Sequence, residues 1–264
     1  MGGGSSYDGR SGQPTRILII NPNSSQEMTK GMLAAVEKMS LGDAIRVSSY
    51  TAPDPAPASI NNGEDIEASD KVVFADADAG KMRLDEYDAA IVACYSVHTL
   101  VTKLPHLSPQ LAVTGIFEAS ITTAQLLLRP HSSEKWGIVT TGKFWEDHLS
   151  AGVKSFLGLD KEGPNSSNFA GVFSTGLDAG DFHNVPQEEV DAKLRDATRR
   201  LLQPGDVKCI VMGCAGMAGL EDIIRSTARD ILGPEAAEKL YVVDGVKAGV
   251  LQVEQMVRSK QYFT

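Results

Sequence analysis

The segment KCIVMGCAG, residues 208–216, decides the fold. It opens with a short apolar run that contains β-branched residues and then stops at a Gly-Cys turn, a pattern typical of a buried parallel strand. The segment AAIVACYS, residues 89–96, has the same form and also delivers a cysteine at the carboxyl end of its run. Ligands of open α/β sheets bind beyond the carboxyl ends of the strands, so Cys94 and Cys214 are both expected to line a crevice.

The two halves of the chain repeat one another around these cysteines. Two further segments read as buried strands that end in a polar turn: ILIINPNSS (17–25) and GIVTTGKFW (137–145). The spacing from Ile17 to Cys94 is 77 positions, and the spacing from Ile138 to Cys214 is 76. The repeat predicts two pseudo-symmetric α/β lobes with an active-site cleft between them, each carrying one thiol at an equivalent place.

Strands alternate with helices along the rest of the chain, which predicts mostly parallel sheets. The expected strands are 17–20, 45–50, 89–93, 111–114, 136–140, 208–212 and 240–243. The expected helices are 28–39, 61–82, 118–128, 144–156, 187–202 and 247–257. The stretch 165–184 shows neither the spacing of an amphipathic helix nor the apolar run of a strand, and it is expected to be irregular.

Composition excludes several classes of partner. The chain has 34 acidic and 25 basic residues and a formal net charge of −9, without a Lys/Arg cluster, which argues against nucleic-acid binding. It has no apolar run long enough to span a membrane. Three cysteines are too few for a disulfide scaffold, so we expect free thiols in a reducing compartment, the cytoplasm. Four histidines show no pairing at metal-ligand spacing, so no metal site is expected; they are His106, His131, His148 and His183.

Two thiols that face each other across a cleft form an acid–base pair. One can remove a proton from a carbon while the other returns a proton to the opposite face, which inverts a stereocentre without a cofactor. Both cysteines precede expected strand-to-helix turns, whose N–H groups should lower the thiol pKa from about 8.5. Ordinary burial of both thiols is the alternative. Cys209 lies inside its apolar run and is expected in the core.

Five segments together carry a family resemblance: INPNSS (20–25), VACYS (92–96), VTTGKF (139–144), GCAGM (213–217) and VVDGV (242–246). The set resembles the Asp/Glu/hydantoin racemase superfamily, in particular the hydantoin/allantoin racemase branch and its fungal relatives, over about residues 16–257. The resemblance implies two flavodoxin-like lobes, with the C-terminal segment returning to the first lobe. It also implies a homo-oligomer and cofactor-independent two-cysteine chemistry next to a carbonyl, with Cys94 and Cys214 as the catalytic pair.

The resemblance also implies the substrate-binding residues. Asn23, Thr140 and Thr141 match positions that bind polar groups of the substrate, although turn and cap roles are the alternative for each. The turns after the two cysteines supply the other candidates: Tyr95, Ser96, Ala215 and Gly216. Typical hydantoin racemases have a Gly/Asp-Pro-type turn where this chain has residues 95–98, so the wall of the site is altered there.

Two residues near the cysteines have open roles. His98 could stabilise the Cys94 thiolate or be a satisfied histidine at a helix start. Glu118 could be a general base, but complementing a helix dipole from the first turn is the favoured interpretation. The segment from Pro53 to Ser59 could cover the cleft or be a rigid surface connection.

The expected organisation has three parts. Residues 1–15 are Gly/Ser-rich and are expected to be a flexible tail or a cloning remnant. Residues 16–110 with 221–264 are expected to form the first lobe, which carries Cys94. Residues 111–220 are expected to form the second lobe, which carries Cys214.

The sequence therefore predicts a cofactor-independent racemase or epimerase. The substrate is expected to be a small hydantoin-like compound, such as allantoin or a 5-substituted hydantoin, or an amino-acid derivative. One alternative on the same fold is a cis–trans isomerase of the maleate type, in which one cysteine is a nucleophile. The other is a small-molecule-binding protein without catalytic activity.

Overall fold

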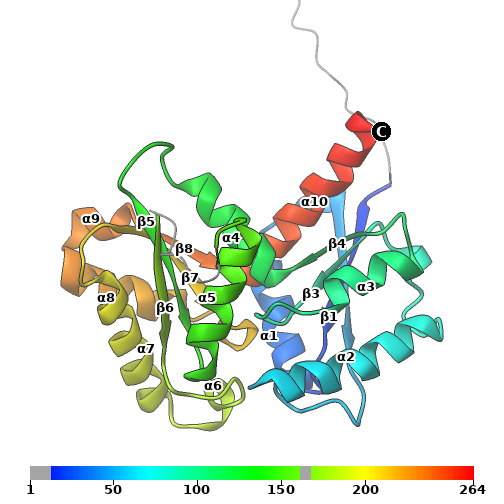
Figure 1. The fold of residues 1–264 in the computed structure, drawn as a ribbon, viewed down its shortest axis with the longest axis horizontal. Helices are drawn as coiled ribbons and strands as arrows, with labels where there is room; N and C mark the ends of the chain where they lie inside the picture. Colours follow the sequence, from blue (N-terminus) through cyan, green and yellow to red (C-terminus); the bar gives the residue numbers. More distant parts are fainter. Residues whose placement is uncertain (1–12, 161–167) are drawn as a thin grey trace, which may run out of the picture.

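Two parallel four-stranded sheets form the framework of the computed structural model, which describes residues 13–160 and 168–264 (Figure 1). The first sheet has the order β2-β1-β3-β4, with β1 (Thr15–Asn21), β2 (Ile45–Thr51), β3 (Ala89–Val92) and β4 (Ala112–Gly115). The second has the order β6-β5-β7-β8, with β5 (Lys135–Thr140), β6 (Phe169–Ser174), β7 (Val207–Gly213) and β8 (Tyr241–Asp244). Each sheet therefore has its first two strands exchanged and its last two in order, which confirms the predicted pair of similar α/β lobes.

The helices follow the expected alternation. They are α1 (Gln26–Glu37), α2 (Gly63–Asp78), α3 (Leu100–Leu107), α4 (Ile116–Leu127), α5 (Phe144–Phe156), α6 (Asp181–Asn184), α7 (Gln187–Leu202), α8 (Glu221–Leu232), α9 (Pro234–Glu238) and α10 (Gly245–Phe263). Short 3₁₀ turns occupy Gly42–Ala44, Leu84–Glu86 and Ala215–Met217. None of the described helices is long and apolar enough to cross a bilayer.

The sequence missed several elements. Strand β6 lies in the stretch expected to be irregular, where Gly171 has a φ of +123° and interrupts the strand pattern. The start of that stretch, 165–167, lies outside the described residues. Helix α3, which carries Pro105 in its interior, and helix α8, which buries Ile224, Thr227 and Ala228, were also not predicted.

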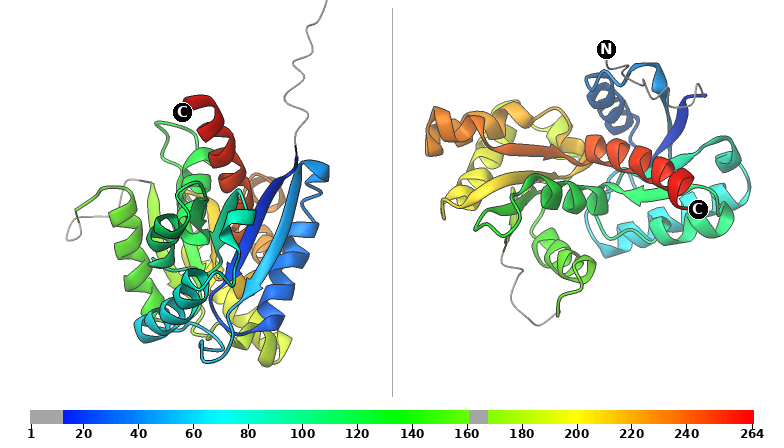
Figure 2. Two further views of the ribbon diagram at one scale, coloured as in Figure 1. Left: turned by 90° about the vertical axis from the view of Figure 1, so that its right-hand side faces the viewer. Right: turned by 90° about the horizontal axis from the view of Figure 1, so that it is seen from above.

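The chain crosses between the sheets after the fourth strand of each. Helix α4 follows β4 of the first sheet but packs against β7 and β8 of the second. Helix α10 follows β8 and packs against β1, β3 and β4, so the C-terminal segment returns to the first lobe as the resemblance implies (Figure 2). Gly249 permits this packing, since a Cβ there would lie 2.9 Å from Cγ2 of Ile91. The exchanged helices α4 and α10 thus join the two lobes.

Strand pairing corrects the predicted lobe boundaries. The prediction assigned β4 to the second lobe and β8 to the first, but β4 pairs with β3 and β8 pairs with β7. The crossover occurs one strand later than expected because the chain leaves each sheet only at Gly115–Ile116 and Asp244–Gly245. The predicted tail also ends earlier, since β1 begins at Thr15; residues 1–12 lie outside the described residues.

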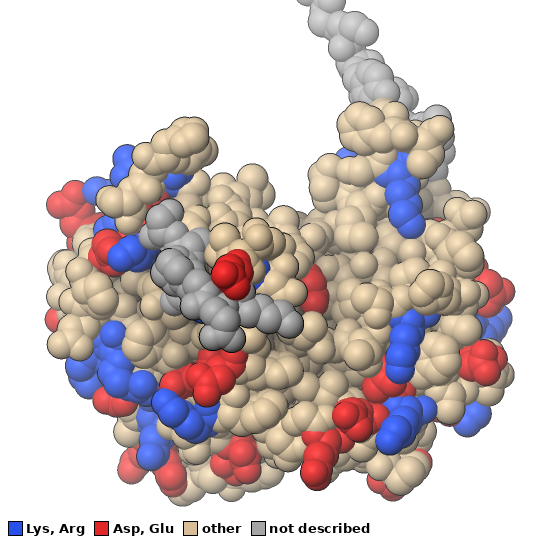
Figure 3. All heavy atoms as spheres, in the orientation of Figure 1, with Lys and Arg blue, Asp and Glu red and all other residues tan. Residues whose placement is uncertain are grey.

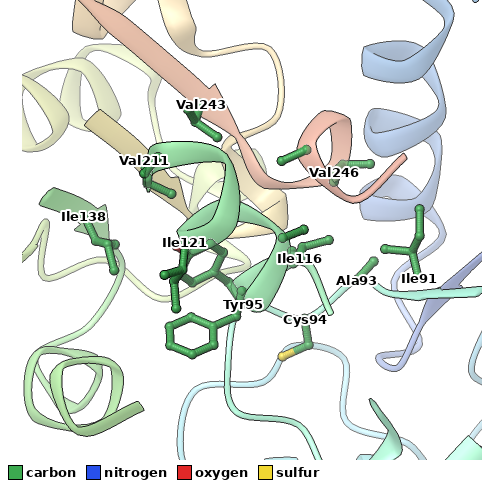
Figure 4. Packing of buried hydrophobic residues seen from close by; sticks show 14 of the residues in the cluster. Ile91, Ala93, Cys94, Tyr95, Ile116, Ile121, Ile138, Val211, Val243 and Val246 are labelled. Atoms are coloured by element: carbon green, nitrogen blue, oxygen red, sulfur yellow. The ribbon is translucent and has the colours of Figure 1, made fainter. Parts of the chain in front are cut away.

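A single hydrophobic cluster spans the two sheets. It contains Ile91 from the first sheet, Ile138 and Val211 from the second, and Ile116 and Ile121 from α4 between them (Figure 4). Cys94 lies at the margin of this cluster. The shared core fixes the carboxyl ends of β3 and β7 relative to each other.

Candidate active site

Cys94 and Cys214 line one cavity between the sheets. Its volume is about 30 Å³, and we call it the thiol cavity. It is lined by Asn23, Met28, Ile60, Ala93, Cys94, Tyr95, Thr141, Trp145, Ala179, Gly213, Cys214, Ala215 and Gly216. The two cysteines follow the third strand of each sheet, so the repeat in the sequence places them at one shared site.

A tight turn after β3 holds the Cys94 thiol. The Ser96 backbone N–H donates to the Cys94 carbonyl at 3.0 Å, and the Ser96 hydroxyl donates to Cys94 Sγ at 3.2 Å. Tyr95 packs edge-on against Phe117 of α4, with ring centroids 5.5 Å apart. Cys94 is 9% exposed, so its side chain is largely shielded from solvent.

Close packing between the ends of β5 and β7 positions Cys214 at the cavity. A Cβ at Gly213 would lie 2.6 Å from Cγ2 of Ile138, so only glycine allows this strand end to pack so tightly. The Thr140 hydroxyl donates to the Gly213 carbonyl at 2.7 Å and holds the two strand ends together. Cys214 then caps the 3₁₀ turn, where the Gly216 N–H donates to its Sγ at 3.3 Å.

Burial raises the pKa of both thiols, to about 12 for Cys94 and about 11 for Cys214. The prediction of lowered pKa values is therefore wrong, because the hydrogen bonds to the two sulfurs do not compensate for loss of solvent in a largely apolar cavity. The nearby charges of Cys214 and Glu118 raise the pKa of Cys94 further. The two sulfurs interact electrostatically, so two thiolates at once are disfavoured.

Five of the seven predicted binding residues line the thiol cavity, and two do not. Those that line it are Asn23, Tyr95, Thr141, Ala215 and Gly216. Thr140 is fully buried, with its hydroxyl committed to Gly213, and Ser96 is fully buried, with its hydroxyl on Cys94. The Ser96 hydroxyl therefore contacts the Cys94 thiol, and the Thr140 hydroxyl joins the ends of β5 and β7. Neither residue lines the cavity.

Asn23 combines the turn role and the cavity role. Its Oδ1 accepts from the Ser25 backbone N–H at 2.9 Å and from Asn21 Nδ2 at 3.0 Å, which shapes the turn after β1. Its Nδ2 lies 3.3 Å from Sδ of Met28, which also lines the cavity. The amide N–H group is thereby held as a donor at the wall.

His98 is a structural residue of the turn after Cys94. The Leu100 backbone N–H donates to His98 Nδ1 at 3.3 Å, so Nε2 carries the ring hydrogen. Nε2 then donates to the Ser69 hydroxyl at 3.1 Å, and that hydroxyl donates to the Ile66 carbonyl. Burial lowers the pKa of His98 to about 4, so the ring is neutral and fastens the turn to α2. Cys209 is fully buried, as predicted.

The sequence missed the residues that close the cavity. Ile60 comes from the segment before α2, Ala179 from the segment before α6, and Trp145 from α5. Ile60 and Ala179 lie on irregular segments far apart in the chain, without a periodic signal. The one sequence feature that pointed there is the segment from Pro53 to Ser59, whose covering role was one of the two alternatives.

Surface charge and titratable clusters show no competing site on the described residues. Basic and acidic side chains are interspersed on the face in Figure 3. Across 13–160 and 168–264, no group of three or more His, Cys, Asp or Glu is placed to hold a metal ion. The thiol cavity is the place where the repeated motifs converge.

Residues 17–253 match the family described as Asp/Glu/Hydantoin racemase. This chain belongs to the Asp/Glu/hydantoin racemase family. An uncharacterized protein of Schizosaccharomyces pombe is 32% identical over 246 residues, which cover 92% of each chain. The hydantoin racemase of Pseudomonas sp. (strain NS671) is 28% identical over 247 residues, covering 92% of this chain and 86% of that protein.

The fold of the family is also found in solved structures. The allantoin racemase from Pseudomonas fluorescens superimposes with a TM-score of 0.73 at 22% identity, over 93% of this chain and 92% of that chain. Membership in the racemase family supports racemase activity in general, and the structural likeness supports the two-lobed architecture.

Proposed function

We propose that this chain is a cofactor-independent racemase or epimerase that inverts a stereocentre next to a carbonyl in a hydantoin-like compound. Allantoin and 5-substituted hydantoins are the favoured substrates, and Cys94 and Cys214 carry out the proton transfers. The observation that carries the proposal is that both thiols line one cavity from equivalent strands of two pseudo-symmetric sheets. Family membership supports the reaction class.

The reaction needs one proton shared between two sulfurs. One cysteine, as thiolate, takes the proton from the α-carbon, and the electron pair of the broken C–H bond moves into the carbonyl. The other cysteine, as thiol, then gives its proton to the opposite face of that carbon. The two cysteines end with exchanged protonation states, ready for the product enantiomer. The raised pKa values make each thiolate, once formed, a stronger base than an exposed one, and they also make the thiolate scarce at neutral pH.

Donors at the wall would hold the carbonyl oxygen as negative charge develops on it. Asn23, Thr141 and the Cys214–Gly216 turn line the cavity, and they offer amide, hydroxyl and backbone N–H donors. Preorganised donors of this kind commonly contribute about 10²–10³ in rate each.

The lining favours an uncharged substrate. None of the described residues that line the thiol cavity carries a charged side chain, and Ile60, Met28 and Trp145 make part of the wall apolar. A dicarboxylate or a zwitterionic amino acid would lose its hydration there without an ionic partner. A neutral hydantoin ring needs only hydrogen-bond donors and acceptors, so we favour it over maleate, aspartate or glutamate.

The test is a screen of single-enantiomer hydantoins and allantoin in D₂O, with aspartate, glutamate and maleate alongside and a chelator present. We expect optical rotation to decay for a hydantoin and deuterium to appear at its α-carbon. Conversion of maleate to fumarate would instead support the cis–trans isomerase. Thermal stabilisation by a hydantoin without any change in rotation would support a binding protein.

We also propose a cytoplasmic, homo-oligomeric enzyme. Subcellular fractionation tests the first, and light scattering of the purified chain tests the second.

A further inference from the structure

Asn21 is joined to Asn23 by two hydrogen bonds. It ends β1 and is fully buried, and it is not among the described residues that line the thiol cavity. Its Nδ2 donates to Asn23 Oδ1, to the Ser25 carbonyl and to Thr29 Oγ1, each at 3.0 Å. Its Oδ1 accepts from the Asn23 backbone N–H at 3.2 Å. The Asn21 amide is therefore engaged at both ends by the turn after β1 and the start of α1.

Backbone groups fix which way round the two amides lie. A backbone N–H can only donate, so the Asn23 atom that meets the Ser25 N–H at 2.9 Å is the oxygen. For the same reason the Asn21 atom that meets the Asn23 N–H is an oxygen, which leaves Asn21 Nδ2 to face Asn23 Oδ1. Asn23 Oδ1 is thus occupied by two donors, and Nδ2 is the end of the Asn23 amide that remains for other partners.

The nitrogen of the Asn23 amide contacts another residue of the cavity wall. Nδ2 donates to Sδ of Met28 at 3.3 Å, and both residues line the thiol cavity. A thioether sulfur is a weak acceptor, and Nδ2 carries two hydrogens, so this contact leaves the amide nitrogen with most of its capacity to donate. Among the described residues it has no other hydrogen-bond partner. The Asn23 side chain therefore has a donor to offer to a substrate oxygen, whereas its acceptor is already engaged.

The hydrogen-bond partners of Asn21 are all uncharged, and so are the groups beyond them. Thr29 Oγ1 meets Thr51 Oγ1 at 2.7 Å, and the Thr51 hydroxyl donates to Gln26 Oε1 at 3.4 Å. A turn role alone is the simpler interpretation of an asparagine at a strand end. It accounts for the bonds of Asn21 to backbone groups, but it does not require the bond from Nδ2 to the side-chain oxygen of a cavity residue.

We propose that Asn21 is a positioning residue that holds the Asn23 amide with Nδ2, rather than Oδ1, towards the substrate carbonyl oxygen on which negative charge develops. This inference rests on the proposed function. With the amide turned over, Asn23 Oδ1 would face that oxygen and destabilise the enolate-like intermediate instead of stabilising it. Asn21 acts only through Asn23 and does not touch the substrate.

The first experiment reverses the polarity at position 21. Asn21→Asp keeps an acceptor for the Asn23 N–H but places a second acceptor opposite Asn23 Oδ1, so the Asn23 amide should turn over. At about pH 9, where the new carboxyl group is ionised, we expect kcat for hydantoin racemisation to fall about 10²-fold, with KM changed much less. Asn23→Ala should lose a similar factor, and the double variant should lose no more than Asn23→Ala alone. Additive losses, or an unchanged kcat in Asn21→Asp, would overturn the assignment.

The second experiment needs no substrate, because it follows the ¹H–¹⁵N signals of the side-chain amides. The Asn21 pair is assigned through its proximity to Thr29, and the Asn23 pair by its absence from Asn23→Ala. In the wild type we expect the Asn21 pair to exchange with solvent about 10-fold or more slowly than exposed asparagine side chains. In Asn21→Asp we expect the Asn23 pair to shift. Rapid exchange of the Asn21 pair, or an Asn23 pair that stays in place, would overturn the assignment.

Thr198→Val is the matched control for loss of a buried hydrogen bond. The fully buried Thr198 hydroxyl donates to the Leu194 carbonyl at 2.7 Å within α7, and Thr198 does not line the thiol cavity. This variant should leave kcat and the Asn23 signals unchanged. If Asn21→Asp does not fold, the exchange rates of the wild type still decide the proposal. Absence of racemisation by the wild type, with the expected amide signals, would reject the proposed function and leave the placement of the Asn23 amide by Asn21 standing.

Discussion

Asn61 Oδ1 accepts a hydrogen bond from the Ala179 backbone N–H at 3.2 Å and so joins segments of the two lobes. Ile60, next to Asn61, and Ala179 both line the thiol cavity. The Pro57 carbonyl accepts from the Ser24 backbone N–H at 3.0 Å, which ties the same segment to the turn that carries Asn23. The segment before α2 therefore covers the thiols, and this contact has to part when a substrate enters.

Removal of the Asn61 side chain should open the thiol cavity. We expect Asn61→Ala to speed alkylation of both Cys94 and Cys214 several-fold, because the inter-lobe hydrogen bond is lost. The matched control is Asn62→Ala, since Asn62 caps α2 through the Asp65 N–H and makes no hydrogen bond to the described part of the second lobe. That variant should cost about 1 kcal/mol in stability without faster alkylation. Equal acceleration in both variants would attribute the effect to loosening of α2 instead.

His98 should make the protein sensitive to acid. Its folded pKa of about 4 lies below the ordinary 6.5, so the unfolded chain binds a proton that the folded protein resists. Stability from this residue is present above pH 6.5 and is lost as the pH falls towards 4, by roughly 2–3 kcal/mol. His98→Asn keeps an acceptor for the Leu100 N–H and does not titrate. Its free energy of unfolding, from urea titrations, should therefore fall less over this range; a slope equal to the wild type would contradict the burial of His98.

Glu118 should have the opposite pH dependence. Burial raises its folded pKa from 4.5 to about 7, so the folded protein holds a proton that the unfolded chain releases. Stability from this residue is present below pH 4.5 and is lost as the pH rises towards 7, by roughly 2–3 kcal/mol. Glu118→Gln should therefore gain stability relative to the wild type between these limits. A difference in unfolding free energy that stays constant with pH would count against a buried, unpaired carboxylate.

Gly213 should be essential for placing Cys214. A Cβ in Gly213→Ala would meet Ile138 and Thr140 side-chain atoms at 2.6 and 3.0 Å, which forces the ends of β5 and β7 apart. We expect a loss of about 1–3 kcal/mol in thermal or chemical denaturation, together with a large loss of activity. Gly142→Ala is the control, because the nearest atom to its Cβ would be 3.9 Å away. Similar losses in both variants would show a general intolerance of this region.

The sequence predicted the parts of the fold that rest on local patterns. Apolar runs bounded by polar turns located the strands, and the repeat of Cys94 and Cys214 at strand ends located the cavity. Strand β8 was assigned to the wrong lobe because the crossover after the fourth strand is set by packing of α4 and α10, which no local pattern encodes. The hydroxyls of Ser96 and Thr140 were predicted on the substrate, but partners supplied by the tertiary fold engage them instead.

The direction of the two thiol pKa shifts could not be predicted from the sequence either. A strand-to-turn pattern predicts N–H donors near each sulfur, and the Gly216 donor is present. How much solvent each thiol loses depends on Ile60, Trp145 and Ala179, which come from three distant segments. Desolvation by these walls outweighs the donors, so the direction of the shift could be obtained only from the assembled structure.

In the proposed reaction, two thiols exchange one proton with the two faces of the same carbon. The direct measurement is ¹H NMR of a single-enantiomer hydantoin substrate in D₂O, combined with polarimetry, for the wild type, Cys94→Ser and Cys214→Ser. We expect racemisation with deuterium incorporation in the wild type. In each variant we expect loss of racemisation by several orders of magnitude, with any residual exchange confined to the enantiomer that the remaining thiol faces. Inversion at the wild-type rate in either variant would contradict the proposed reaction.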